Sequence, residues 1–127
     1  MSEAAPRTDR YVLTIDLRDD PAAIAEYRQY HAEIWPEVIR SFQNIGVQDL
    51  DLHLLGRRLV MIIELSAGLD LRGTFARHAS SHPRVQEWER LMATFQQPVP
   101  DARPGEWWAL MERVCRFPDP DPQGAAP

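Results

Sequence analysis

The first half of the chain alternates between strand-like and helix-like hydrophobic patterns. Residues 11–17 are mainly β-branched, aromatic and leucine residues, which predicts a strand. From Pro21 to about Asn44 apolar residues recur every three or four positions, which predicts a helix with one apolar face. Pro36 interrupts this helix because proline has no backbone N–H to donate, so we expect a kink or a break near residues 32–35.

A β-hairpin is predicted next. Residues 47–55 place leucines on one side and acidic or histidine side chains on the other, which is the alternation of a half-buried strand. Gly56-Arg57 then forms a tight turn, and residues 58–65 form the second strand.

The second half predicts two helices and a closing strand. Residues 70–78 have a weak helical pattern, whereas residues 83–95 show a clear apolar stripe that begins at a proline. Residues 96–105 contain three prolines and are expected to be a connection. Residues 106–117 are predicted to close the domain with a strand that includes two tryptophans.

The order β-α-β-β-α-β is that of a ferredoxin-like α+β fold, in which an antiparallel sheet carries its helices on one face. The other face is then bare, and we expect Met61, Ile63 and Trp108 to lie on it. Because monomers rarely expose an apolar patch of that size, the sequence predicts a twofold homodimer packed through the open sheet face.

A chain of 127 residues is expected to form one domain. Residues 1–10 are small, polar and charged, and residues 118–127 are rich in proline and alanine. Neither end can bury enough apolar surface to order itself, so both are predicted to be disordered, with residues 11–117 as the domain.

Composition narrows the possible partners. A net charge of −5, from 19 acidic and 14 basic residues, argues against nucleic acid. No apolar run approaches the length of a membrane helix, so no membrane association is expected. Cys115 has no second cysteine with which to form a disulfide, which favours a reducing, cytoplasmic location.

The densest group of chemically useful residues lies on the first helix. Tyr27, His31 and Trp35 are four residues apart, so they share the helix face that also carries the apolar stripe. A histidine directed at the sheet could exchange a proton near neutral pH. The alternative is a structural histidine bonded to a backbone carbonyl, with Tyr27 and Trp35 as packing residues.

A second candidate group lies on the helix over residues 83–95. Trp88 faces inward, and aromatic rings commonly pack on sugars, while the adjacent Glu89 could accept hydrogen bonds from hydroxyl groups. The alternative is a core tryptophan beside a solvated glutamate. The histidine and cysteine spacings match no metal motif, and no phosphate-binding loop is present in the sequence, so neither metal nor cofactor is predicted.

The segment of residues 26–37 follows the pattern E-Y-x-x-x-H-x-x-I-W-P-E, which resembles the signature of the L-rhamnose mutarotase family. The likeness extends through residues 60–65 and 84–92 to residues 112–114. It implies a ferredoxin-like fold in a dimeric α/β-barrel-type assembly. It also implies an isomerase that interconverts the α and β anomers of a 6-deoxy-hexose without a cofactor, with a monosaccharide as its small-molecule partner.

The resemblance also implies roles for single residues. His31 matches the family's proton donor, Tyr27 matches a substrate-contacting tyrosine, and Trp35 belongs to the same motif as a further candidate substrate contact. Trp88 matches the first of two adjacent tryptophans, and Glu89 stands where the second would be.

Leu50 stands where rhamnose enzymes carry a sugar-contacting tyrosine, so two substrate-binding positions, Leu50 and Glu89, depart from their pattern. The stretch from Pro83 to Glu112 is similar to a branch associated with L-fucose catabolism. These differences favour L-fucose over L-rhamnose, because a carboxylate in place of a tryptophan recognises hydroxyl groups differently.

Mutarotation opens the sugar ring, rotates the C1–C2 bond and closes the ring again, with one proton passing to the ring oxygen and another leaving the anomeric hydroxyl. We expect His31 to handle one of these protons, and Glu89 to bind hydroxyls or carry the second. Two alternatives remain open: a cofactor-independent oxygenase or haem-handling protein of the same fold, and a sugar-binding module without catalysis.

Overall fold

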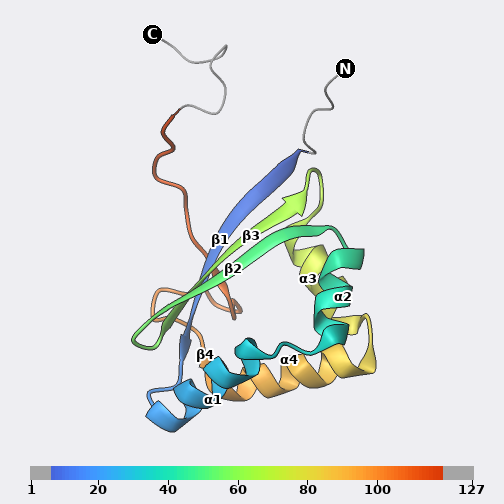
Figure 1. The fold of residues 1–127 in the computed structure, drawn as a ribbon. Coiled ribbons are helices and arrows are strands. Elements are labelled where there is room, and N and C mark those ends of the chain that lie inside the picture. The colour runs from blue at the N-terminus through green and yellow to red at the C-terminus, as the bar shows by residue number, and fades with distance from the viewer. Residues whose placement is uncertain (1–6, 119–127) are drawn as a thin grey trace.

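A computed structural model describes residues 7–118 of the protein (Figure 1). Its elements, in chain order, are β1 (Thr8–Leu17), α1 (Pro21–Ala32), α2 (Pro36–Asn44), β2 (Val47–Leu55), β3 (Arg58–Ser66), α3 (Leu71–Ser80), α4 (Pro83–Phe95), β4 (Gln96–Gln97) and β5 (Ala109–Leu110). The parts of the two predicted disordered ends that cover residues 1–6 and 119–127 lie outside the described residues.

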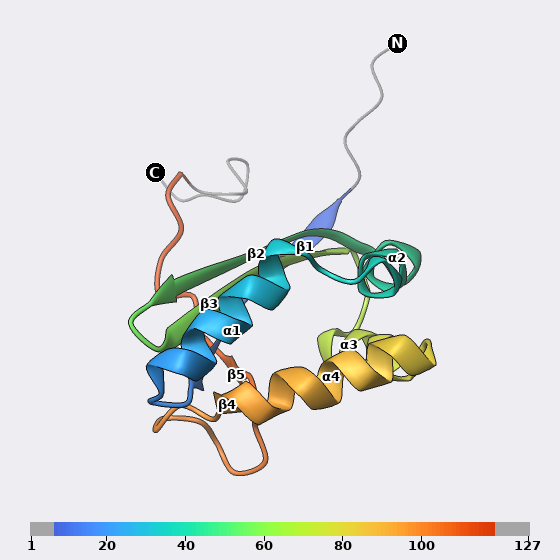
Figure 2. The same cartoon turned by 60° about the horizontal axis from the view of Figure 1, so that its bottom comes forward.

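One antiparallel sheet has the order β2-β3-β1-β4, with β5 also paired to β1. The helices lie together on one side of this sheet, and the opposite side carries none (Figures 1 and 2). The predicted ferredoxin-like α+β fold is confirmed. The hairpin between β2 and β3 turns at Gly56, which has a φ of 61° that favours glycine.

The predicted break in the first helix is also present. Asp20 caps α1 by accepting a hydrogen bond from the backbone N–H of Ala22, and α1 ends at Ala32. Helix α2 begins at Pro36, where the missing N–H costs nothing because the first turn of a helix has no partner for it. The chain changes direction between α1 and α2, so the two helices cover different parts of the sheet (Figure 1).

The hydrophobic core lies between the sheet and the helices, and its composition corrects one prediction. Met61 and Ile63, expected on the open face, point toward the helices and are 7% and 0% exposed. Trp108 packs against both core clusters. The strand register decides this orientation, because Leu13 of β1 lies opposite Met61 and both belong to the buried row.

The open face of the sheet is therefore more polar than predicted. Val12, Val60 and Ile62 form its apolar centre, since each alternates with a core residue along its strand. Charged residues surround this centre on the same face: Arg10, Asp16, Asp49, Asp51, Arg58 and Glu64.

The first and the last strand of the chain differ from the prediction in length. Strand β1 begins at Thr8, three residues early, because Thr8 pairs with Ser66 of β3. The long closing strand is reduced to Ala109 and Leu110. A strand must pair its backbone groups with a neighbour. The free edge of β1 pairs with β4 over two residues and with β5 over two others, and after β5 the chain leaves the sheet (Figure 1).

Candidate active site

A cavity of about 590 Å³ lies between the helices and the concave side of the sheet, within the size range of small-molecule sites. Helices α1, α2 and α4, strands β2 and β3 and the segment before β5 all contribute to its wall. The lining residues include five of the six predicted site residues: Tyr27, His31, Leu50, Trp88 and Glu89.

The sixth predicted residue, Trp35, does not line this cavity. Its ring packs edge-on against Trp88 at 5.1 Å between centroids, and the guanidinium of Arg84 lies 3.8 Å from its ring centre. Trp35 therefore packs against Trp88 from outside the cavity, at the residue directly before α2, where the chain has already turned away from α1. The predicted direct contact between Trp35 and a substrate has no support in this geometry.

His31 sits on α1 with a defined tautomer. Its Nδ1 lies 2.9 Å from the backbone carbonyl oxygen of Tyr27, and a carbonyl can only accept, so Nδ1 carries the hydrogen. Burial lowers the pKa of His31 below its ordinary value, and the hydrogen bond to the Tyr27 carbonyl opposes this only in part. Near neutral pH the imidazole is thus uncharged, with a lone pair on Nε2 that can accept a proton.

Tyr27 stacks on His31 with 4.3 Å between ring centroids, and its hydroxyl belongs to a hydrogen-bonded chain. The indole N–H of Trp107 can only donate, and it lies 2.9 Å from Oε1 of Gln96. This contact directs the Gln96 amide nitrogen to the Tyr27 oxygen, 3.2 Å away. Tyr27 therefore accepts from Gln96, and its own hydrogen stays free to be donated.

The pKa of Tyr27 supports the same role. Burial raises it to about 12, the Gln96 hydrogen bond opposes this, and the negative charge of Glu89 adds to the rise. The phenol consequently stays protonated at neutral pH, and it can serve as a hydrogen-bond donor to a bound molecule.

Trp88 and Glu89 enter the cavity from consecutive positions of α4. The indole ring of Trp88 lies edge-on to His31 at 5.4 Å between centroids, and it is 5% exposed. The side chain of Glu89 is 47% exposed, so its carboxylate is accessible to a ligand. Leu50 contributes only an apolar surface, from β2 on the opposite wall.

Two functional candidates were missed by sequence reasoning. Gln96 falls in β4, at a position that the sequence assigns to a connection, and Trp107 falls in the segment assigned to a strand. Their roles depend on a contact across eleven residues that brings the end of α4 beside the chain before β5. No local pattern signals such a contact.

Two physical properties of residues 7–118 concern other partners. No helix there is long and apolar enough to cross a bilayer. Likewise, in this part of the chain, no three histidine, cysteine, aspartate or glutamate side chains gather closely enough to hold a metal ion.

Comparison with solved structures identifies the fold class. An L-rhamnose mutarotase from Formosa agariphila superposes with a TM-score of 0.61 at 18% identity, covering 86% of this chain and 98% of the other. The tetracenomycin F2 cyclase of Streptomyces glaucescens superposes with a TM-score of 0.60 at 20% identity, covering 88% and 99%. At these identities the similarity shows the ferredoxin-like fold alone.

Sequence comparison is more specific. The family model described as L-rhamnose mutarotase matches residues 10–117. An L-fucose mutarotase of Xanthomonas campestris pv. campestris is 40% identical over 107 residues, which are 83% of this chain and 85% of the relative. An L-rhamnose mutarotase of a Jannaschia species is 31% identical over 103 residues, covering 76% and 88%.

The chain belongs to the L-rhamnose mutarotase family. This membership confirms the resemblance found in the segment of residues 26–37, and with it the predicted class of enzyme, a sugar mutarotase among the isomerases. It does not by itself assign roles to the cavity residues.

Proposed function

We propose that this protein interconverts the α and β anomers of L-fucose, with L-rhamnose as a poorer substrate, in the cavity between α1, α4 and the sheet. The observation that carries the proposal is the neutral His31 with its Nδ1 hydrogen committed to a carbonyl, beside a tyrosine whose hydrogen is free. Such a pair can accept one proton and donate a hydrogen bond, as ring opening requires.

In the proposed reaction, Nε2 of His31 takes the proton of the anomeric hydroxyl as the C1–O5 bond breaks. The ring oxygen receives a proton from a second group, and the open aldehyde rotates about C1–C2. Reversal of both transfers closes the ring on the other face. Tyr27 holds the sugar by donating a hydrogen bond, and Glu89 binds hydroxyls or carries the second proton.

The preference for L-fucose rests on the cavity wall and on the relative from Xanthomonas, which is named for that sugar. Leu50 offers no hydrogen-bonding group, whereas Glu89 offers a carboxylate to the hydroxyls. A site built to pair with particular hydroxyls discriminates strongly against a sugar whose hydroxyls point elsewhere.

The direct test measures anomer exchange by saturation-difference NMR with L-fucose and L-rhamnose. His31→Asn is the informative variant, because its amide N–H can replace the Nδ1 hydrogen bond to the Tyr27 carbonyl while Nε2 is lost. We expect exchange to fall about 10²- to 10⁴-fold, the usual contribution of general acid–base catalysis. His82→Asn, at an exposed histidine that caps α4, should retain the activity.

The same experiment separates the alternatives. Saturable sugar binding without exchange would support the sugar-binding module, and oxygen consumption with an aromatic substrate would support the oxygenase. Unchanged exchange in His31→Asn would remove His31 from the mechanism.

The proposal includes a homodimer formed through the open sheet face. The strand registers place the apolar centre at Val12, Val60 and Ile62 on the side of the sheet opposite the core. None of the helices within residues 7–118 lies on that side (Figure 2). On the same face Asp49 and Asp51 lie on β2, and Arg10, which pairs with Glu64 at 3.6 Å, lies on β1, so a twofold axis can bring Arg10 of one copy to the acidic β2 strand of the other.

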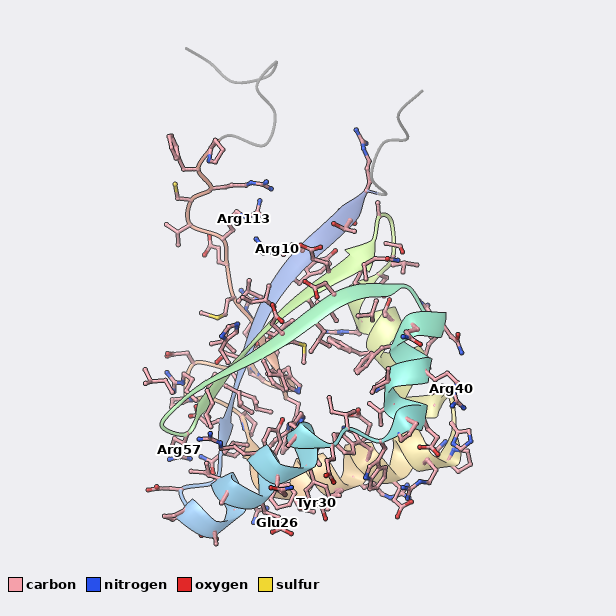
Figure 3. All side chains as sticks on the ribbon, in the orientation of Figure 1. Arg10, Glu26, Tyr30, Arg40, Arg57 and Arg113 are labelled. Atoms are coloured by element: carbon pink, nitrogen blue, oxygen red, sulfur yellow. The ribbon has the colours of Figure 1, made fainter. Side chains whose placement is uncertain are left out.

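The segment after β5 supports the same assembly. Val114 and Phe117 are each 94% exposed, and this segment, which carries Arg113, extends away from the domain (Figure 3). A second copy offers apolar surface to such side chains. The cytoplasmic location stays a prediction, for which the single cysteine, Cys115, remains the argument.

A further inference from the structure

His78, on α3, is a buried histidine that the proposed mechanism has not used. It is 2% exposed, and its ring stacks on Phe42 with 3.9 Å between centroids and 9° between planes. Phe42 lines the cavity on its other side, so His78 lies directly behind the cavity wall.

The hydrogen bonds around His78 determine which of its nitrogens carries a hydrogen. Oγ of Ser81 lies 2.7 Å from the His78 carbonyl oxygen, to which it must donate its single hydrogen. Ser81 then accepts from Oγ of Ser41 at 2.8 Å. The hydrogen of Ser41 is thereby used, so Ser41 accepts from Nδ1–H of His78 at 2.8 Å. Only this direction satisfies all three contacts.

The other nitrogen, Nε2, has no hydrogen-bond partner within residues 7–118, although it is fully buried. It faces Oε1 of Glu89 at 3.4 Å. Because Nδ1 already carries a hydrogen, a neutral His78 beside an ionised Glu89 would set one lone pair against another. A single proton, on either the imidazole or the carboxylate, turns this repulsion into attraction.

We propose that His78 and Glu89 share one proton, and that His78 positions Glu89 as the second proton-transfer group of the mutarotase reaction. This inference rests on the function proposed above and deepens it. Glu89 reaches the cavity, and His78 is a positioning residue that acts through it.

The proton balance of the reaction is then complete. As the C1–O5 bond breaks, the shared proton passes through the Glu89 carboxyl to the ring oxygen, while Nε2 of His31 takes the proton of the anomeric hydroxyl. Ring closure on the other face returns both protons to where they began. Neither an oxidant nor a co-reactant is needed.

The shared proton can be tested without any sugar, by ¹⁵N NMR of the histidine side chains in the full chain. We expect Nδ1 of His78 to be protonated, and Nε2 to have a shift between the bare and protonated limits or at the protonated limit. In Glu89→Gln, Nε2 should move to the bare limit, since an amide can donate to it but cannot share a proton. A bare Nδ1 in the unaltered protein, or no response to Glu89→Gln, overturns the inference.

The catalytic part of the inference is tested with L-fucose, by anomer exchange in His78→Gln, Glu89→Gln and the double variant. The glutamine amide can replace Nε2 as a donor to Glu89 but supplies no mobile proton. We expect each single change to lower the maximum exchange rate at least about tenfold, His78→Gln with little change in KM because His78 does not touch the sugar, and the double variant to be no slower than the slower single one. Multiplying losses overturn the coupling between His78 and Glu89.

A matched control is His82→Gln, which makes the same substitution at an exposed histidine and should leave the exchange rate unchanged. Should His78→Gln fail to fold, the nitrogen spectra of the unaltered protein and of Glu89→Gln still decide about the shared proton. Absence of exchange in the unaltered protein would instead refute the proposed function, which separates the two failures.

Discussion

Groups that can only donate or only accept a hydrogen bond fix the chemistry of this cavity. A backbone carbonyl determines the tautomer of His31, and the indole N–H of Trp107 determines the direction of the Gln96 amide. The proton positions in the cavity therefore follow from groups whose own roles are unambiguous.

The lowered pKa of His31 predicts the pH dependence of anomer exchange. The base must be neutral, so kcat/KM should be constant around neutral pH and fall only when the pH drops below about 6.5, the ordinary histidine value. The measurement is kcat/KM for L-fucose between pH 4 and 8 with the uncatalysed exchange subtracted. A loss that begins above the ordinary histidine value would contradict the neutral, buried imidazole.

Trp107→Phe tests the hydrogen-bonded chain to Tyr27. The ring is retained but the indole N–H is lost, so the Gln96 amide is free to turn its oxygen toward Tyr27 and take up the phenol hydrogen. Tyr27 then cannot donate its hydrogen bond to the sugar, and the loss of a hydrogen bond at a buried polar group costs about 1–3 kcal/mol. We therefore expect kcat/KM to fall about 10- to 100-fold while the fold stays intact. Trp35→Phe is the control, because Trp35 lies outside the cavity, and it should retain most of the activity.

At the scale of elements, α1 and α4 supply the reactive side chains. The prolines that begin α2 and α4 determine where these side chains lie. Helix α1 ends at Ala32 and α2 begins in a new direction at Pro36. His31 therefore lies in the last turn of α1, where it lines the cavity. Pro83 begins α4, which carries Trp88 and Glu89 along the opposite wall.

The turn before β2 has an element-scale prediction. Gly46 has a φ of 98°, and a Cβ built there would lie 2.5 Å from Cδ1 of Leu69. Gly46→Ala should therefore lower the free energy of unfolding by about 1–3 kcal/mol through backbone strain. The steric clash of the new Cβ with Leu69 should lower it further. Gly56 has a φ of 61° and open space around its Cα, so Gly56→Ala should lower the free energy of unfolding by less. Urea unfolding of both variants measures the difference, and equal costs would refute the clash.

The predictability of the elements differed along the chain. The alternation in β2 and the apolar stripe in α4 are local patterns, so the sequence predicts both elements with the bounds that the structure shows. The closing strand was predicted from composition, but its length depends on how much of the β1 edge remains for pairing. Likewise, the face on which Met61 and Ile63 lie depends on the register with β1, which alternation alone leaves open.

At the scale of the whole molecule, the uncovered sheet face predicts association. Ile62→Lys places a charge at its apolar centre, where a second copy would have to bury it. We expect the unaltered protein to sediment as a dimer and Ile62→Lys to sediment as a monomer, while circular dichroism stays the same. Arg40→Glu, on α2 away from the sheet face, is the control and should remain a dimer (Figure 3). A dimer that survives Ile62→Lys would contradict this interface.

The family, the order of elements and five of the residues that meet at the cavity can be predicted from the linear sequence, because each depends on a local motif or on a hydrophobic period. Three features depend on the folded structure: the position of Trp35 outside the cavity wall, the hydrogen-bonded chain from Trp107 to Tyr27, and the contact between His78 and Glu89. All three features depend on how segments from different parts of the chain meet in the fold. A sequence motif does not encode which group donates and which accepts across such a contact.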